Sequence, residues 1–517
     1  MANPSSLVPT PPSNDHPDNE MWVDEQIWGH RLWDSQSPWL LFLEFLNIAE
    51  ACHRDNRLLD EQGKYYPLNF RPYQRMFLRN ILFNNEALFR IGERYPDSTS
   101  AWSNWLAWMN DNAKAVPSRD FSYLQNRFQS FPQFASLVAM LRGSAVENET
   151  NRRWTSRFVF PFGPNALYED LNVTPADTVV REYINFGRTG ELLYMMLCRS
   201  AGAAQLRPHL ADMLAGQNPW DTVVTLFQPQ GPEDRHTRGK SYLPYREHYR
   251  FDLLAEDWLH ILELRLPGFD AFPHLVTFGA LHVVLYQLYL AAEWCGETRP
   301  VHFICEVVAP KKTLVRELSG LNYQNNMQLP QRAVKAYVKR IEESEDWCRA
   351  AAQPGAFSTC KKILLERVRW PRDEEDYDGP NDPGLLMARL RERAVTRHRQ
   401  HVANIHRNYG RDVGLVSKRG TNKLRYAPTD ALLKALILAN VKQRMEYKEF
   451  LSRVFSRYGF VFGDREAERV LDGEEYDKKA FQANAERLEQ RLVSIGMLRR
   501  LSDACAYVQN PFSRTAP

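Results

Sequence analysis

The stretch FQANAERLEQRLVSIGMLRRLSDACAYV at residues 481–508 changes from a helical pattern to a strand pattern within one short segment. Its first half has apolar residues at the spacing of one helical face, including Phe481, Leu488 and Leu492, and ends at Gly496, a residue type that commonly terminates helices. Its second half has two short predicted strands, Met497–Leu501 and Ala504–Val508, on either side of the polar turn Ser502–Asp503. The stretch therefore predicts a helix followed by a β-hairpin.

Two further helices are predicted immediately before this stretch. Pro428-Thr429-Asp430 is a helix start, and an apolar stripe follows it. From Tyr447 to Tyr458 apolar residues again recur every three or four positions, and Gly459 stands where a left-handed C-cap belongs. Three helices followed by a hairpin are the layout of a winged helix, a variant of the helix-turn-helix motif. Such modules bind DNA through the third helix and the wing, or they dock partner proteins.

A basic arm precedes these helices and follows an acidic linker. Residues 371–384 combine six carboxylates with three prolines and two glycines, a composition too charged to form a buried core, and we predict a domain boundary there. Clustered cations neutralise phosphates and release counterions, so the arm, the third helix and the wing supply the candidate nucleic-acid-binding residues. The alternative for the arm is a solvated helix face, and Glu486 and Glu489 on the third helix would repel phosphates. The candidates are Arg397, Arg399, Arg407, Arg411, Lys418, Arg419, Lys423 and Arg425 in the arm, Arg487, Gln490 and Arg491 on the third helix, and Arg499 and Arg500 on the wing.

The rest of the chain is predicted to be mainly α-helical and divided into several domains. Tryptophans in the N-terminal part recur at helical spacing, which favours core packing over a base-stacking platform. The apolar run His274–Trp294 is interrupted by polar residues and is predicted to be a buried central helix, with no membrane span. Val301–Val308 is rich in β-branched and aromatic residues and predicts one strand. The predicted parts are a disordered lead at 1–20, a helical Trp-rich domain at 21–145, a central mostly helical domain with some strand at 146–370, the acidic linker at 371–384, and the basic arm with the winged-helix domain at 385–517.

Composition limits the chemistry further. The formal net charge of +3 over 517 residues is too small for the whole protein to be basic, so any nucleic-acid footprint depends on local clustering. The seven cysteines occur singly, with no C-x-x-C pair to suggest a zinc or redox site, which is typical of reduced thiols in the cytoplasm. The first 20 residues lack the basic and apolar regions of a secretory signal.

Motifs for catalysis are absent or incomplete. Arg238-Gly239-Lys240-Ser241 resembles the end of a phosphate-binding loop, but Asp234 stands where the first glycine is required. A nuclease centre around Glu306 would need a lysine at Val308, although Asp252, Glu256 and Asp257 could supply further metal-binding oxygens. We therefore predict no catalytic residues, no metal and no cofactor.

These features favour a non-enzymatic subunit, DNA-associated or scaffolding, of a multi-protein bacterial system, of the kind that serves phage defence or DNA processing. Its expected partners are duplex DNA and other protein subunits. Two alternatives stay open: a protein–protein adaptor whose winged helix docks partner proteins, and a metal-dependent nuclease whose centre the sequence does not reveal. Steep salt dependence distinguishes DNA binding from the adaptor, and metal-dependent turnover would establish the nuclease.

Overall fold

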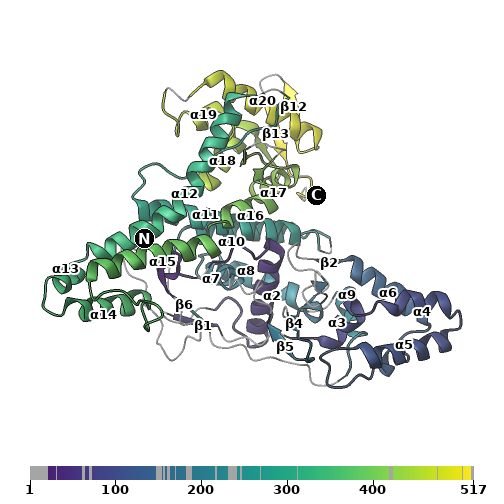
Figure 1. Cartoon of the computed structure of the whole chain (residues 1–517). Helices are drawn as coiled ribbons and strands as arrows, with labels where there is room; N and C mark the ends of the chain where they lie inside the picture. Colours follow the sequence, from purple (N-terminus) through teal and green to yellow (C-terminus); the bar gives the residue numbers. More distant parts are fainter. Residues whose placement is uncertain are drawn as a thin grey trace.

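The computed structural model describes most of the chain and is mainly helical, as the sequence predicts (Figure 1). Among the residues that the structure describes, the strands form only sheets of two or three strands. The predicted lead at 1–20, the loop at 231–240 and Arg419 lie outside the described residues. The described residues are 21–30, 32–60, 65–68, 73–146, 154, 158–159, 163–168, 171–181, 189–215, 218–230, 241–244, 247–267, 269–310, 312–418, 423–473, 476–502 and 505–513.

Several tryptophans of the N-terminal part lie in the core, as their spacing predicts. Trp28, Trp102 and Trp105 are buried, and the indole Nε1 of Trp28 donates to the carbonyl of Gln287, 3.1 Å away in the central helix α11. The longest helix here, α2, begins at Pro38, where the hydroxyl of Ser37 caps the amide of Leu40. The elements are α1 (Val23–Trp28), α2 (Pro38–Arg54), β1 (Tyr65–Leu68), α3 (Met76–Phe83), α4 (Ala87–Arg94), α5 (Ser98–Asn112) and α6 (Phe131–Gly143).

The helix α11 (Phe272–Cys295) is the centre of the fold. It is long and apolar enough to cross a membrane, but most of its side chains are buried against α2, α10 and α12, as a core helix requires. This confirms the buried helix predicted at His274–Trp294. The other elements of this part are β2 (Ala145–Val146), β3 (Phe158–Val159), β4 (Leu171–Val173), β5 (Val179–Arg181), α7 (Thr189–Cys198), α8 (Ala203–Leu214), α9 (Pro219–Thr225), β6 (Ser241–Pro244), α10 (Arg250–Glu263), β7 (Phe303–Ile304), α12 (Leu314–Glu342), α13 (Glu345–Ala351) and α14 (Ala356–Val368).

The strand predicted at Val301–Val308 is regular only over β7. It pairs in parallel with β11 (Phe460–Val461), which comes from the C-terminal part of the chain. Beyond β7 the extended backbone bonds to other segments: the amide of Glu306 donates to the carbonyl of Tyr426, and the amide of Val307 donates to the side chain of Asn484. The strand is shorter than predicted because side chains and a second segment take the hydrogen bonds that a longer sheet would use.

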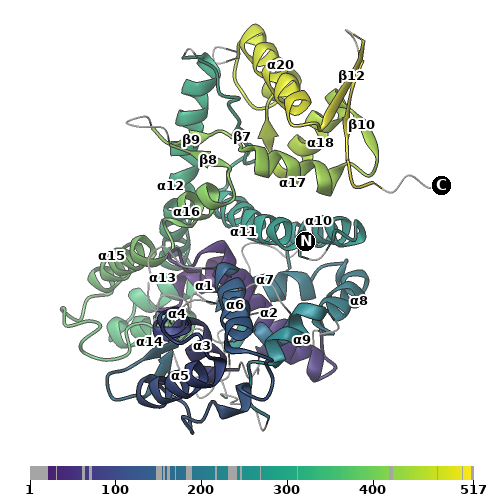
Figure 2. The same cartoon turned by 90° about the vertical axis from the view of Figure 1, so that its right-hand side faces the viewer.

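The C-terminal part contains the predicted three helices and hairpin (Figure 2). Gly459 ends the second helix in the left-handed region, with φ of 78°, as its sequence position predicts. A short strand before this helix joins the hairpin, which gives an antiparallel sheet in the order β10-β13-β12. The elements are α17 (Asp430–Asn440), β10 (Arg444–Glu446), α18 (Tyr447–Tyr458), β11, α19 (Asp464–Ala467), α20 (Lys478–Ser494), β12 (Leu498–Ser502) and β13 (Cys505–Gln509).

A buried ionic network fixes this part on the central helices. Asp257 of α10 lies 2.7 Å from Nε2 of His282 in α11 and 2.6 Å from Nη2 of Arg457 in α18. The hydroxyl of Tyr458 donates to the same carboxylate at 2.8 Å. Asp257 and His282 are fully buried, so one carboxylate joins three helices in a place that water does not reach.

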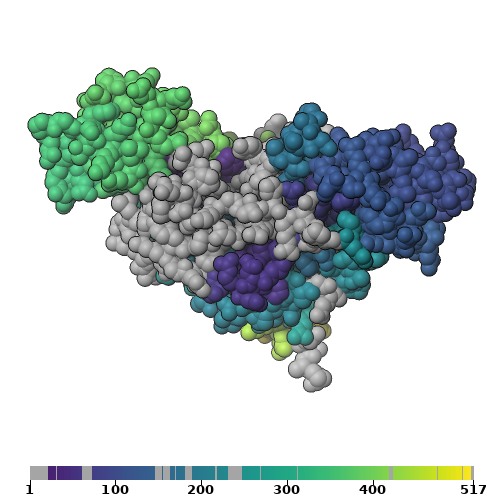
Figure 3. Space-filling model, turned by 90° about the horizontal axis from the view of Figure 1, so that it is seen from below, coloured from purple at the N-terminus to yellow at the C-terminus, as the bar shows by residue number. Residues whose placement is uncertain are grey.

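The basic arm forms α15 (Pro383–His401), α16 (Ile405–Asp412) and the hairpin of β8 (Val416–Ser417) and β9 (Arg425–Tyr426). Helix α15 packs against α12, α14 and α1, so contacts with the N-terminal half follow directly after the acidic segment. Figure 3 shows the lobe that contains α13 and α14, in green, and the lobe of α4 to α6, in blue, at opposite ends of one face. The division predicted at 371–384 stays a prediction, and the contacts of α15 indicate how to test it.

We expect that, after a protease cuts the chain between Glu374 and Asp378, the two fragments stay bound to each other under native conditions. The side chains of Glu374 and Asp378 are exposed, whereas Leu386, Leu390 and Ala394 of α15 are buried. The apolar contacts of α15 therefore have to be exposed to water before the fragments separate. Size-exclusion chromatography of the cut protein checks this, and elution as two separate fragments would contradict it.

Candidate nucleic-acid interface

The predicted cations of α15 are held partly inside the protein. Arg397 is mostly buried, with Nη2 3.5 Å from Glu25 and Nε 3.9 Å from Asp24 of α1. The neighbouring His398 also contacts Asp24, at 3.2 Å, and stacks on Trp28. Arg399 is exposed, and its Nε donates to the amide oxygen of Gln331 at 3.1 Å. Arg397 thus joins α15 to α1 by ion pairs. Of the two predicted arginines on α15, only Arg399 faces solvent.

Four predicted cations are exposed together on α16 and the hairpin. Arg407 and Arg411 stand one turn apart on α16, and Lys418 and Lys423 flank the loop between β8 and β9. The helix and the hairpin are in close contact, because a side-chain methyl group of Val416 lies against Gly410. This set of four residues is called the α16–hairpin patch below.

A buried polar cluster fixes the frame of the α16–hairpin patch. The hydroxyl of Tyr426 in β9 lies 2.9 Å from Nε2 of His406 in α16, and it accepts a hydrogen bond from Asn326 of α12 at the same distance. The ring of Tyr323 packs against His406 and Tyr426. Burial raises the pKa of Tyr323 to about 12, although Arg407 and Arg411 oppose the shift. Because three elements share these contacts, the hairpin has little freedom to move relative to α16.

His406 makes the stability of this frame dependent on pH. Burial lowers the pKa of His406 to about 3, whereas histidine in an unfolded chain titrates near 6.5. Between these values the unfolded chain binds a proton that the native protein does not, so stability is complete above about pH 6.5 and falls as the pH decreases.

We expect the wild-type protein to lose about 1 kcal/mol more of its free energy of unfolding between pH 7 and 5.5 than a His406→Gln variant does. Glutamine keeps a group that can accept from Tyr426 but does not titrate. Urea unfolding of both proteins at the two pH values provides the measurement. Parallel pH profiles for the two proteins would show that His406 is not kept neutral by burial.

Arg425 belongs to a buried ionic cluster. Its guanidinium pairs with Glu306, and Arg316 of α12 pairs with the other carboxylate oxygen at 2.7 Å. Glu306 and Arg425 are both buried. Arg425 is therefore placed to anchor β9 to α12, and Glu306 is held by two arginines.

The carboxylates considered for a nuclease are also held by protein donors. Asp252 accepts from the amide of Ala201 at 2.7 Å, and Glu256 and Asp257 pair with Arg457. Among the described residues no group of three histidine, cysteine, aspartate or glutamate side chains is placed to hold a metal ion. These carboxylates thus take part in structural hydrogen bonds and ion pairs.

The third helix of the C-terminal part, α20, turns its two predicted arginines toward the protein. Arg491 donates to Asp430 at 2.6 Å and to the carbonyl of Pro428 at 3.1 Å. Arg487 is half-buried, and its Nη2 lies 3.5 Å from Oδ1 of Asn484. The exposed face carries Gln490 and Glu486. The structure therefore does not bring the arginines of α20 together with those of the α16–hairpin patch on one open surface.

The hairpin β12–β13 presents the remaining candidates. Arg499 and Arg500 are exposed on β12, and Nε of Arg500 lies 3.6 Å from Glu489 of α20. Sequence reasoning missed the acidic partners of the inward-facing arginines, which are Asp24, Glu25, Glu306 and Asp430. Most of these partners are more than 100 residues away in sequence, so no local pattern indicates them.

Comparison with known proteins gives a match to part of the chain. A family model described as methylation-associated defense system protein MAD7 matches residues 384–510. The matched span begins in α15 and ends just after β13, so it contains the basic arm, the α16–hairpin patch and the three C-terminal helices with their hairpin. No curated protein and no solved structure matches the chain. Over this span, the chain is similar to a protein of a defence system.

Proposed function

We propose that this protein is a non-enzymatic, cytoplasmic subunit of a methylation-associated defence system that holds duplex DNA by its phosphates. The observation that carries the proposal is the α16–hairpin patch, which has four exposed cations on a rigid frame within the span that is similar to the defence family. When cations on a preformed surface bind phosphates, only their side-chain rotamers have to be ordered, so the entropic cost of binding is small. Contacts of this kind are independent of base sequence.

We also infer that the C-terminal segment is a winged helix. The order α17, β10, α18, α20, β12, β13 supports this, with the short β11 and α19 inserted between α18 and α20, as does the sheet order β10-β13-β12. In a DNA-reading winged helix the third helix enters the major groove. Here Glu486 is exposed on α20, and Arg487 and Arg491 are turned inward. We therefore assign DNA contact to the α16–hairpin patch and the wing residue Arg499, and we assign no base reading to α20.

The test is a titration of the full-length chain against labelled duplex and labelled single strand at about 50 and 200 mM salt. The proposal predicts binding to duplexes of any sequence, and an affinity that decreases by about 10²-fold between the two salt concentrations if four phosphates are neutralised. Absence of binding at the lower salt concentration would reject it.

A second candidate function, a protein–protein adaptor, is favoured by exposed apolar side chains on α20 and β12. Val493 of α20 and Leu501 of β12 are exposed by 47% and 58%, and Glu486 is exposed on the same helix. Exposed apolar side chains favour docking of a protein, and an exposed carboxylate on the same helix disfavours phosphates. Pull-down of the other subunits of the defence system by wild-type protein and by a Val493→Ser/Leu501→Ser variant would separate this function from DNA binding, because that variant keeps the α16–hairpin patch.

A further inference from the structure

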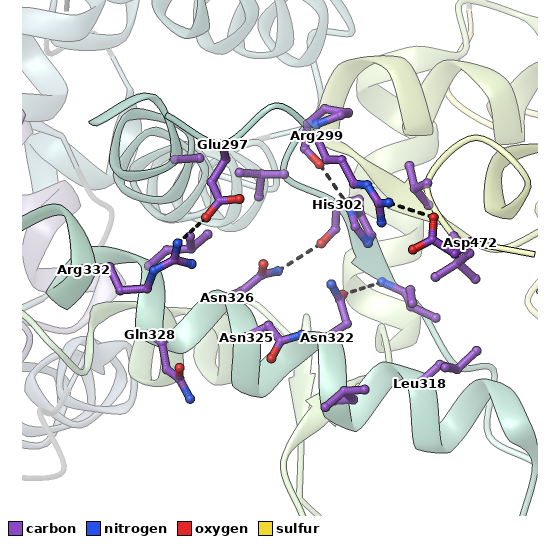
Figure 4. A pocket seen from close by; sticks show the side chains of 18 residues that line it. Glu297, Arg299, His302, Leu318, Asn322, Asn325, Asn326, Gln328, Arg332 and Asp472 are labelled. Atoms are coloured by element: carbon purple, nitrogen blue, oxygen red, sulfur yellow. Dashed lines mark hydrogen bonds and ion pairs between the residues drawn. The ribbon is translucent and has the colours of Figure 1, made fainter. Parts of the chain in front are cut away.

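A polar cavity of about 370 Å³ lies where the central helices meet the C-terminal part (Figure 4). Its walls come from the end of α11 and the segment that follows it, from one face of α12, and from Val470–Asp472 after α19. This volume is at the low end of the range for ligand-binding pockets. The cavity is separate from the α16–hairpin patch, because the cations of that patch do not line it.

Amide side chains of α12 form one wall of this cavity. Asn326 is already engaged, donating to the carbonyl of His302 at 3.0 Å and to the hydroxyl of Tyr426 at 2.9 Å. The oxygen of Asn322 accepts from the amide of Ile304 at 2.9 Å. The side chains of Asn325 and Gln328 line the cavity, are exposed, and make no hydrogen bond to the described part of the chain. Two carboxamides, one helical turn apart, are thus available to a ligand.

The charges of the cavity are balanced. Arg299 pairs with Asp472 at 2.7 Å, and Arg332 pairs with Glu297 at 2.5 Å. All four side chains are about one-third or more exposed, so these pairs contribute little stability and can rearrange around a ligand. A phosphate ligand would lie near two carboxylates, which is unfavourable. Apart from His302, the described lining also has no aromatic ring on which a nucleobase could stack.

We propose that this cavity binds an extended peptide segment of a partner protein. Each free carboxamide offers one acceptor and two donors, which match the C=O and N–H groups that a peptide backbone presents side by side. Asn325 and Gln328 are about 4.5 Å apart along the helix axis, and the longer glutamine side chain can span the roughly 6.7 Å repeat of an extended chain. Leu318 and Leu321 line the same wall and would contact one apolar side chain of the peptide.

The experiment selects peptides from a random display library on the full-length chain and measures the affinity of a selected peptide by fluorescence anisotropy. An Asn325→Ala/Gln328→Ala variant should bind that peptide at least about tenfold more weakly, because it loses several hydrogen bonds of about 1 kcal/mol each. The matched control is Gln324→Ala, which removes an exposed amide from the same helix outside the cavity and should leave the affinity unchanged.

Two results would overturn the proposal. One is that the selected peptides bind the double variant as tightly as the wild type. The other is that the cavity takes a nucleotide, seen as binding of ATP or of a short thymidine oligonucleotide that the double variant loses and Gln324→Ala keeps. Neither amide belongs to the α16–hairpin patch, so the double variant should bind duplex DNA like the wild type. Measuring its duplex affinity therefore separates this test from the test of the proposed DNA function.

Discussion

Replacing Asp257 with alanine is expected to lower the free energy of unfolding by about 3 to 5 kcal/mol, the usual cost of removing one partner from a buried ion pair. The carboxylate is fully buried and accepts from Arg457, Tyr458 and His282 at 2.6 to 2.9 Å. Without this carboxylate, the mostly buried guanidinium of Arg457 has no buried counter-charge. Tyr458 and His282 also lose the group that accepts their hydrogen bonds. Urea unfolding measures the change.

The matched control is Glu256→Ala. Glu256 pairs with the same arginine, Arg457, at 2.6 Å, but it is half-exposed, and exposed ion pairs contribute at most about 1 kcal/mol. If both variants lose the same small amount of stability, Asp257 is not the buried centre of the network. His282 provides a second check, because burial lowers its pKa while hydrogen bonding to Asp257 opposes this shift. Loss of Asp257 should therefore lower the pKa of His282 further.

The C-terminal helices could be predicted from the sequence because their signals are local. Apolar residues at one-face spacing and the glycines at 459 and 496, both with positive φ in the structure, define α18 and α20 without reference to other parts of the chain. The buried helix α11 was predicted for the same reason, because its length and the polar residues that interrupt it lie within one continuous stretch of sequence.

Which of the cations are exposed and which form buried ion pairs could not be predicted from the sequence. Arg397 and Arg407 look alike in the basic arm, yet Arg397 pairs with Asp24 and Glu25 of α1 and Arg407 is exposed. Which face of α15 is covered depends on the packing of α1, whose residues are more than 300 positions away. The same argument applies to Arg425, whose partner Glu306 lies in the extended segment that the sequence predicted as a strand.

The largest functional effect is expected from removing the α16–hairpin patch. A variant with alanine at Arg407, Arg411, Lys418 and Lys423 should bind duplex DNA on the order of 10²-fold more weakly at about 50 mM salt, because it loses up to four phosphate contacts. These side chains are exposed, so the fold should tolerate their replacement. Near-native thermal stability of the variant would confirm that tolerance.

The slope of affinity against salt distinguishes direct phosphate contact from a general effect of charge. Four lost contacts should reduce the slope of log K against log salt by about 3 to 4, since each contact contributes about 0.9. A control variant with alanine at Lys335, Lys339, Arg349 and Lys362 removes the same charge from exposed positions of α12, α13 and α14 and should keep the wild-type slope. If both variants lose affinity equally, DNA responds only to net charge and the α16–hairpin patch is not an interface. If neither loses affinity, the contacts lie elsewhere, and Arg499 with its neighbour Arg500 becomes the next pair to replace.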